Sequence, residues 1–429
     1  MGEILTAVNL VILILLGINV AACQLAPSTP TLPPSHQGSG HLAYIGRDGN
    51  VYVTTVNHAM RQLTNDATAS SETEGYSYHR LAWSPDGSLA FAGIRRAKNT
   101  FKSKLYIAAI AQNNATQLVG QSDESFVIYM HWSPVPCPNR PTCHRLAYLI
   151  EEADSISLRL VEIDENTIKN ERIGLGRPFY FSWSPDGQEM LWHTGGAHRY
   201  NPAAQLIRYD LETGRITSTA KPTGLFLAPA WSPQGDRWLS TTAAAEINQL
   251  QLSRADSIET LSTATNRHIA FAWSPNGEQI AYALQENSDV PIYGPIHIFD
   301  TKTGQTHRLT EPRFRITGFF WSPDGQRLAY LVKLLPDAGR LQWRMYNLIT
   351  AKDRGFTTFL PAFQMGFIIG SFNQYVQSHR LWSPDSRYLV YVDRDYWLVE
   401  RVWLVDTWAG ADTSPIFVAE GSLGIWSWQ

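Results

Sequence analysis

Short runs of apolar and aromatic residues recur along the chain, and each run ends at a turn signal. In the stretch Gly318–Tyr330, two such runs flank the tetrapeptide Ser322-Pro323-Asp324-Gly325. Proline presets φ for the second position of a turn, aspartate suits the third position, and glycine accepts the positive φ that follows. The stretch therefore predicts a β-hairpin with a three-residue loop.

This hairpin pattern repeats along the chain, and a Trp-Ser pair marks each copy at intervals of roughly 40–60 residues. Most copies keep the sequence Trp-Ser-Pro-x-Gly, but Ser386 replaces the glycine in one copy and Val135-Pro136 replaces the turn in another. The marking tryptophans are Trp83, Trp132, Trp183, Trp231, Trp273, Trp321, Trp382 and Trp426.

Three further short strands are predicted between one marker and the next. Between Trp273 and Trp321 they are the apolar runs 279–282, 295–300 and 307–310, separated by turn residues. Four short strands in each repeat are typical of one blade of a β-propeller.

The two ends of the repeat region complement each other. Residues 41–44 match the second strand of a repeat but have no Trp-containing first strand before them. Residues 421–429 match a Trp-containing first strand but have no second, third or fourth strand after them. Pairing these ends in one blade would close the ring and remove its open sheet edges. We therefore expect residues 41–429 to form an all-β, eight-bladed β-propeller of four-stranded antiparallel blades, with seven blades as the alternative.

The first 40 residues are expected to lie outside the propeller. An apolar run of about 16 residues, 5–20, is short for a membrane span and precedes Ala21-Ala22-Cys23. Residues 1–22 resemble a bacterial lipoprotein signal, which implies cleavage before Cys23 and a lipid on that cysteine. An uncleaved anchor remains the alternative, because Glu3 and no basic residue precedes the run. Residues 23–40 are rich in Pro, Ser and Thr and predict an extended tether.

The other two cysteines, Cys137 and Cys143, lie in one enlarged, proline-rich turn. A disulfide across this turn would suit an oxidising compartment outside the cytoplasm. Half of a metal site is the competing interpretation, but Cys23 is the only other cysteine and a spacing of six is not that of a zinc ribbon.

Charge limits the possible partners. The net charge of −3 and a pI near 6.5 do not indicate the excess of positive charge that nucleic-acid binding needs. One local basic cluster, in a loop within a blade, is best explained as solvated: Arg95, Arg96, Lys98, Lys102 and Lys104. We expect a monomer that needs no cofactor.

The longest interval between markers contains an insertion, residues 359–379, which is too apolar for a free loop. We expect it to pack over the channel mouth, either as a structural plug or as part of a binding site. The candidate contact residues are Gln374, Tyr375 and His379, joined from neighbouring loops by His198, Arg199, Tyr200 and Trp397.

The Trp-Ser-Pro-Asp-Gly copies, with the following Leu-Ala-Tyr and Arg-Leu-Thr segments, resemble the repeat of TolB-type propellers. The stretches that carry this resemblance are 299–310 and 321–330. It implies a non-enzymatic, extracytoplasmic scaffold in the bacterial cell envelope. Such a scaffold would bind an envelope protein or a small ligand at the channel mouth.

Two enzyme classes share propellers of this repeat type. Prolyl oligopeptidase relatives need a Gly-x-Ser-x-Gly nucleophile elbow, which the chain lacks. The repeat is also similar to that of oligogalacturonate lyases, which implies a metal held in the channel by histidines and a glutamine; the candidates are His131, His268, His379 and Gln374. A membrane-tethered interaction or ligand-binding module is therefore the predicted function, and a metal-dependent polysaccharide lyase is the alternative.

Overall fold

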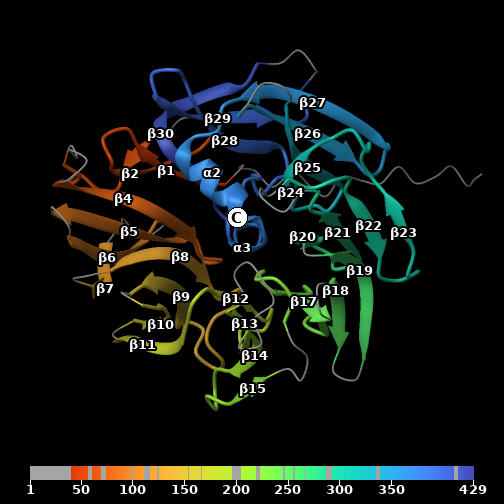
Figure 1. Ribbon diagram of the computed structural model, residues 1–429. Helices are drawn as coiled ribbons and strands as arrows, with labels where there is room; N and C mark the ends of the chain where they lie inside the picture. Colours follow the sequence, from red (N-terminus) through yellow and green to blue (C-terminus); the bar gives the residue numbers. More distant parts are fainter. Residues whose placement is uncertain are drawn as a thin grey trace, which may run out of the picture. The chain divides into compact units, whose positions relative to one another are not determined.

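The computed structural model describes residues 40–56, 60–68, 74–97, 100–110, 116–122, 125–152, 154–165, 167–195, 204–218, 223–244, 247–254, 257–265, 267–286, 292–334, 339–409 and 414–429. Residues 39–429 form one compact unit. Within this unit, antiparallel sheets surround a centre that holds two short helices (Figure 1). The predicted all-β propeller is confirmed.

Six of the sheets have four strands each, and sequence order runs outward from the centre of the ring. The first sheet contains β4 (Glu74–Trp83), β5 (Ser88–Ala97), β6 (Thr100–Ala109) and β7 (Thr116–Ser122). The second contains β8 (Phe126–Trp132), β9 (His144–Glu151), β10 (Ile156–Asp164) and β11 (Thr167–Gly176). The third contains β12 (Phe179–Trp183), β13 (Glu189–Thr194), β14 (Gln205–Asp210) and β15 (Ile216–Ser218).

The next three sheets repeat this order. They are β16 (Ala230–Trp231), β17 (Arg237–Ala244), β18 (Ile247–Arg254) and β19 (Ile258–Thr265); β20 (Ile269–Trp273), β21 (Gln279–Leu284), β22 (His297–Asp300) and β23 (Thr306–Arg308); and β24 (Ile316–Trp321), β25 (Arg327–Lys333), β26 (Leu341–Asn347) and β27 (Lys352–Phe359).

The seventh sheet has six strands and closes the ring. Its order is β28 (Tyr388–Arg394), β29 (Glu400–Asp406), β30 (Ile416–Trp426), β1 (Leu42–Gly46), β2 (Val51–Thr54) and β3 (Arg61–Gln62). Leu42 pairs with Trp426 across β1 and β30. The predicted closure by the N- and C-terminal strands is confirmed.

The ring has seven sheets, so the alternative of seven blades is confirmed and the expectation of eight separate blades is corrected. The reason is β30, whose first half pairs with β29 and whose second half pairs with β1. One continuous strand thus serves both the last repeat and the closing repeat. The inner strand of the last repeat is correspondingly reduced to an isolated bridge between Trp382 and Leu389.

The repeated tryptophans link neighbouring repeats of the ring by hydrogen bonds. In six repeats, the indole Nε1 donates a hydrogen bond to the carbonyl oxygen of the residue directly before the tryptophan of the preceding repeat. The pairs are Trp83 with Ile425 (3.2 Å), Trp132 with Ala82 (3.0 Å), Trp183 with His131 (3.0 Å), Trp273 with Ala230 (3.1 Å), Trp321 with Ala272 (3.4 Å) and Trp382 with Phe320 (3.0 Å). A buried indole N–H is stabilised by such a partner, so in these six repeats the bond helps to orient neighbouring blades.

In the six repeats that keep the Trp-Ser-Pro turn, its fifth position has the predicted positive φ. Gly325 has φ of +67°, and Ser386, which replaces glycine in its repeat, adopts φ of +60°. The serine of the motif closes the turn: Ser322 Oγ accepts a hydrogen bond from the backbone N–H of Arg327 at 3.0 Å. All of these turns lie at the same end of their blades, because each joins a first strand to a second strand.

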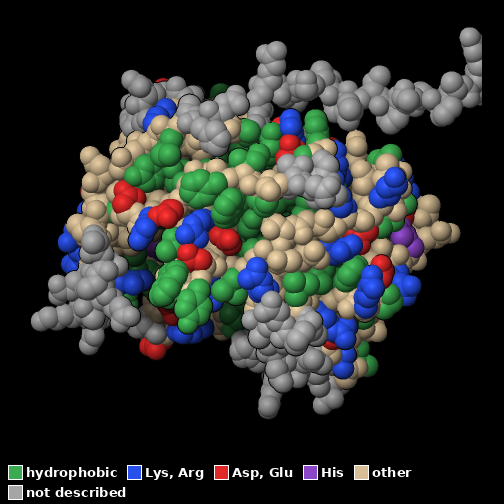
Figure 2. Space-filling view, turned by 90° about the horizontal axis from the view of Figure 1, so that it is seen from above, with side chains coloured by type: hydrophobic (Ala, Val, Ile, Leu, Met, Phe, Trp, Pro, Cys, Tyr) green, Lys and Arg blue, Asp and Glu red, His purple; other side chains and the backbone are tan. Residues whose placement is uncertain are grey.

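The predicted disulfide is present between Cys137 and Cys143, in the turn between β8 and β9. No helix of the described residues is long and apolar enough to cross a membrane. On the side of the protein drawn in Figure 2, basic and acidic side chains are interspersed. That side shows no continuous basic surface of the kind that nucleic acid needs.

Candidate functional site

The insertion forms two helices that the sequence did not predict, α2 (Phe363–Gly370) and α3 (Phe372–Ser378). Both lie at the centre of the ring (Figure 1), and α3 contacts the inner strands β8, β12, β20 and β24. We call this pair the plug.

Backbone groups of the inner strands hold the plug by hydrogen bonds. Tyr375 Oη donates to the carbonyl oxygen of Ile128 at 3.2 Å. The side chain of Asn373 accepts a hydrogen bond from the N–H of Phe271 at 3.3 Å. Gln377 Nε2 donates to the carbonyl oxygen of Pro229 at 2.9 Å. Because these partners belong to different blades, the plug ties opposite parts of the ring together.

Of the seven contact residues predicted from sequence, the four that the structure describes lie in different surroundings. Gln374 and Tyr375 are 1% and 3% exposed inside the plug, whereas His379 is buried next to the central cavity described below. Trp397 is 80% exposed and lies in the loop between β28 and β29. The other three, His198, Arg199 and Tyr200, lie outside the described residues.

A cavity of about 470 Å³ lies in the centre of the ring, on the side of the Trp-Ser-Pro turns. We call it the central cavity. Its walls come from those turns and its floor from the end of the plug. The wall includes Trp183, Trp231, Trp273, Trp321, Trp382 and Trp428 with Pro134, Pro185, Pro233, Pro275 and Pro323, and the floor includes Val376, Gln377, His379 and Arg380.

The plug thus closes the channel from one side and leaves the other side open. β28 begins beside the turn 383–387 and ends beside the loop that carries Trp397. Trp397 therefore lies at the opposite end of its blade from the Trp-Ser-Pro turns. The insertion was expected over the channel mouth, whereas α3 packs against the inner strands of the channel, and the cavity that remains is on the other face of the ring.

The polar groups of the central cavity are cationic or neutral. Among the described residues that line it, none is an aspartate or glutamate. Burial, and beyond it the charge of Arg380, lowers the pKa of His131 to about 3. Burial, with smaller contributions from Arg80 and His131, lowers the pKa of His379 to about 3. Both histidines are therefore neutral at physiological pH, and Arg380 carries the formal charge of the cavity.

The residues of the predicted metal site are not gathered at one point. His131 stands one residue before the end of β8, whereas His268 stands one residue before the start of β20. Inner strands run in the same direction around a propeller, so these two side chains lie at opposite ends of the channel. In the described part of the chain, no group of three His, Cys, Asp or Glu residues could hold a metal ion.

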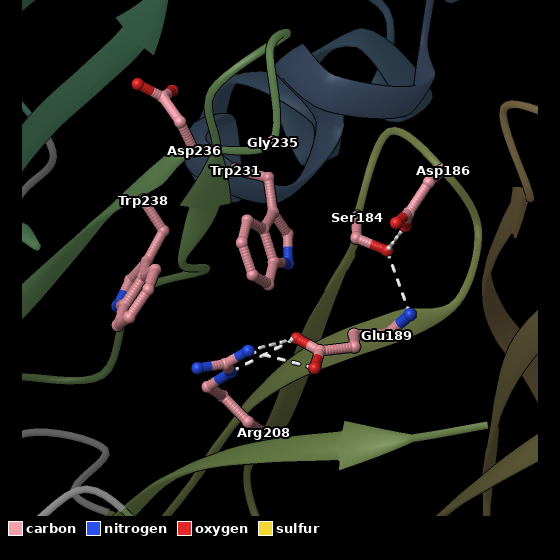
Figure 3. Close-up of a pocket in the computed structure, with 8 residues that line it drawn as sticks. All are labelled: Ser184, Asp186, Glu189, Arg208, Trp231, Gly235, Asp236 and Trp238. Atoms are coloured by element: carbon pink, nitrogen blue, oxygen red, sulfur yellow. Dashed lines mark hydrogen bonds and ion pairs between the residues drawn. The ribbon is translucent and has the colours of Figure 1, made fainter. Parts of the chain in front are cut away.

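A second, smaller cavity of about 230 Å³ lies between the blades that begin with β12 and β16 (Figure 3). Arg208 crosses it: its Nη2 lies 2.6 Å from Glu189 Oε2. The guanidinium carbon also lies 5.8 and 5.3 Å from the ring centres of Trp231 and Trp238. The protein's own cation therefore already occupies the aromatic faces of this cavity.

Trp231 lines both cavities, and it departs from the repeat. Its indole Nε1 has no hydrogen-bond partner among the described residues, unlike that of six other marker tryptophans. The blade interface at Trp231 therefore lacks the bond that joins most other repeats.

Sequence reasoning missed Arg380 and the ring of prolines. The prolines were detectable, because one turn repeated in every blade must place its proline on one rim. The role of Arg380 was not detectable from sequence, because its position depends on which side of the channel the insertion closes.

No protein-family model matches the chain. Solved structures with a similar fold include a prolyl endopeptidase, 12% identical over 80% of this chain and 50% of that one, with a TM-score of 0.56. An oligogalacturonate lyase in complex with manganese is 13% identical over 80% of this chain and 96% of that one, with a TM-score of 0.50. A TolB from Acinetobacter baumannii is 15% identical over 77% and 79% of the two chains, with a TM-score of 0.42.

These similarities concern the fold alone. This chain spans about half the length of the prolyl endopeptidase chain that it matches.

Proposed function

We propose that the protein is a membrane-tethered, extracytoplasmic propeller of a bacterial cell envelope that binds a partner in the central cavity. The partner is a segment of an envelope protein or a small ligand. The observation that carries this proposal is the wall of tryptophan and proline side chains around a concave site of about 470 Å³. That volume is within the usual range of roughly 300–1,000 Å³ for ligand sites.

Rigid aromatic and proline side chains suit such a role. They offer large contact areas and lose little conformational entropy when a partner binds. Here hydrogen bonds from backbone N–H groups to the serine hydroxyls hold the turns that carry these side chains. The cavity is therefore preorganised for binding.

The last residue of the proposed tether, Gly40, lies on the side of the Trp-Ser-Pro turns. Gly40 is close to Pro384 of a Trp-Ser-Pro turn and to Gln429. A lipid on Cys23 and an extended segment 23–40 would hold the propeller near a membrane. In a test by cell fractionation, Cys23→Ala should release the protein from membranes. Unchanged membrane association of a normally cleaved variant would contradict the lipid anchor.

The binding proposal can be tested by filling the cavity. Val376→Trp adds a large side chain to the floor of the central cavity, where Val376 is partly buried. Ile349→Trp adds the same side chain at a position that is 64% exposed, in the loop between β26 and β27. In cells treated with a cross-linker, the partner captured by the wild type should also be captured by Ile349→Trp and lost with Val376→Trp. Equal capture by both variants would overturn the proposal.

The lyase alternative gains no support from the arrangement of its four candidate residues. His131 and His379 adjoin the central cavity, but Gln374 is inside the plug and His268 is at the other end of the channel.

A further inference from the structure

We propose that the central cavity recognises a carboxylate attached to an apolar or aromatic body, and that Arg380 binds the carboxylate. This inference rests on the proposed binding role of the cavity and specifies the chemistry of its ligand.

Arg380 is partly buried, and unlike Arg80 and Arg344 it has no described residue that pairs with its side chain. Arg80 donates to the carbonyl oxygens of Ile128 and His79 and to Gln364 Oε1. Arg344 is paired with Asp353 at 3.0 Å. Among the described residues, the guanidinium of Arg380 has neither a hydrogen bond nor an ion pair, and its contact is with the ring of Trp428.

The stacking on Trp428 leaves the edge of the guanidinium available. The guanidinium carbon lies 3.6 Å from the centre of the Trp428 ring, so the face of the group is covered. The five N–H donors of an arginine point outward in the plane of the group. A carboxylate can therefore approach this edge from the cavity and accept two parallel hydrogen bonds.

The environment makes an anion the expected partner. Burial lowers the pKa of Arg380 to about 10, because the surrounding protein replaces water around the charge. A charge in such surroundings is costly unless an opposite charge accompanies it. Since no carboxylate lines the cavity among the described residues, the missing counter-charge is most simply supplied by the ligand.

The walls define the rest of the ligand. Around Arg380 the lining is mainly apolar, with indole and proline rings beside Phe271, Phe320 and Leu381. The other polar groups of the lining are uncharged: Ser182, Ser232, Ser274, Gln377 and the neutral His131 and His379. The apolar side chains favour an apolar or aromatic group and offer few partners for a polar one. Inorganic anions and sugars, which need many hydrogen bonds, fit this surface less well than an aromatic carboxylate.

A carboxylate of this kind has two sources, the C-terminus of a protein and a free aromatic acid. The test uses the full chain and three probes: the tripeptide N-acetyl-Ala-Ala-Phe with a free carboxylate, the same peptide as its C-terminal amide, and 3-phenylpropionate. Binding is measured by titration calorimetry and by tryptophan fluorescence, because six tryptophans line the cavity. The acid peptide should bind at least about tenfold more tightly than the amide, which lacks the charge.

Substitution of Arg380 tests whether this residue causes the difference in affinity between the acid peptide and the amide. Arg380→Gln should remove the difference between acid and amide while leaving the weak binding of the amide unchanged. Arg380→Lys keeps the charge without the planar fork and should retain part of the difference. Arg313→Gln is the matched control: Arg313 is paired with Glu311 on the surface, and its loss should leave the difference intact.

Equal binding of acid and amide by the wild type would overturn the inference, as would an unchanged difference in Arg380→Gln. The wild-type comparison decides the matter even if a variant does not fold. Binding of 3-phenylpropionate together with the acid peptide would indicate a free acid as the natural ligand, and binding of the acid peptide alone would indicate a protein C-terminus. Failure of the carboxylate inference leaves the capture experiment with Val376→Trp untouched, so the two proposals can fail separately.

Discussion

At the scale of single residues, the marker tryptophans do more than fill the space between blades. Their aromatic rings bury large areas, and in six repeats the indole N–H reaches the backbone of the preceding blade. Two markers, Trp231 and Trp426, lack this bond among the described residues. These two tryptophans therefore serve as an internal control for the contribution of the indole hydrogen bond to the free energy of unfolding.

Trp132 and Trp426 form the matched pair for this measurement. Both are at most 2% exposed, but only Trp132 has a bonded Nε1. Trp132→Phe should lower the free energy of unfolding more than Trp426→Phe does, by about 1 kcal/mol, the usual net value of a hydrogen bond. Urea denaturation of the two variants measures the difference. Equal losses would show that the indoles act by packing alone.

Burial of neutral histidines makes stability depend on pH. The pKa of His131 and of His379 is lowered to about 3, below the value of about 6.5 in an unfolded chain. The unfolded chain therefore takes up protons that the folded chain does not as the pH falls from about 6.5 towards 3. Stability is fully present above pH 6.5 and falls with acidification, by at most about 1.4 kcal/mol per pH unit for each histidine.

His131→Gln should flatten this dependence between pH 6 and pH 4, because glutamine does not titrate. The same substitution at the surface residue His307, which is exposed on β23, is the control and should leave the dependence unchanged. Thermal unfolding at several pH values gives both curves. A steep, unaltered curve in His131→Gln would assign the acid sensitivity to other groups.

At the scale of elements, the repeat predicted most strands and the insertion escaped prediction. Periodic apolar runs with Pro, Asp and Gly at fixed offsets define hairpins locally, so β24 and β25 could be placed from sequence. The plug could not be placed, because α2 is apolar nearly all round and no side chain caps its first turn. Such a helix is specified by the ring of strands around it rather than by an amphipathic stripe.

The plug should be necessary for stability through its buried aromatic residues. Phe372 is 2% exposed and packs against Phe319 and Phe320, with ring centres 4.7 and 5.6 Å away. Phe372→Ala should lower the free energy of unfolding by about 3–5 kcal/mol. Phe363→Ala is the control: this residue of α2 is 75% exposed, and its removal should change stability by less than about 0.5 kcal/mol. A small effect of Phe372→Ala would mean that the ring closes without the plug.

At the scale of the whole molecule, the sequence predicted closure by the two terminal strands but not the sharing of β30. Repeat counting treats each copy as separate, and it cannot show that residues 416–426 stay in one strand while changing partner. Gly421 stands where that change occurs. A Cβ atom at this position would clash with the backbone oxygen of Ile45.

Ring closure should therefore be sensitive to one methyl group. Gly421→Ala should force β1 and β30 apart and lower the free energy of unfolding by about 1–3 kcal/mol, the usual cost of overpacking. Gly366→Ala, within α2, meets no atom within 4 Å and should be neutral or stabilising, because alanine favours helices. Denaturant unfolding of both variants provides the comparison. Equal stability of the two would show that the shared strand tolerates displacement.

The central claim is that partners bind on the side of the Trp-Ser-Pro turns. Site-specific photo-cross-linking in whole cells tests it most directly, with the photoreactive residue placed either at Pro275 on the wall of the central cavity or at Trp397 at the opposite end of its blade. The account predicts a discrete cross-linked product from position 275, lost on adding Val376→Trp, and none from position 397. A product from position 397 with none from position 275 would contradict it.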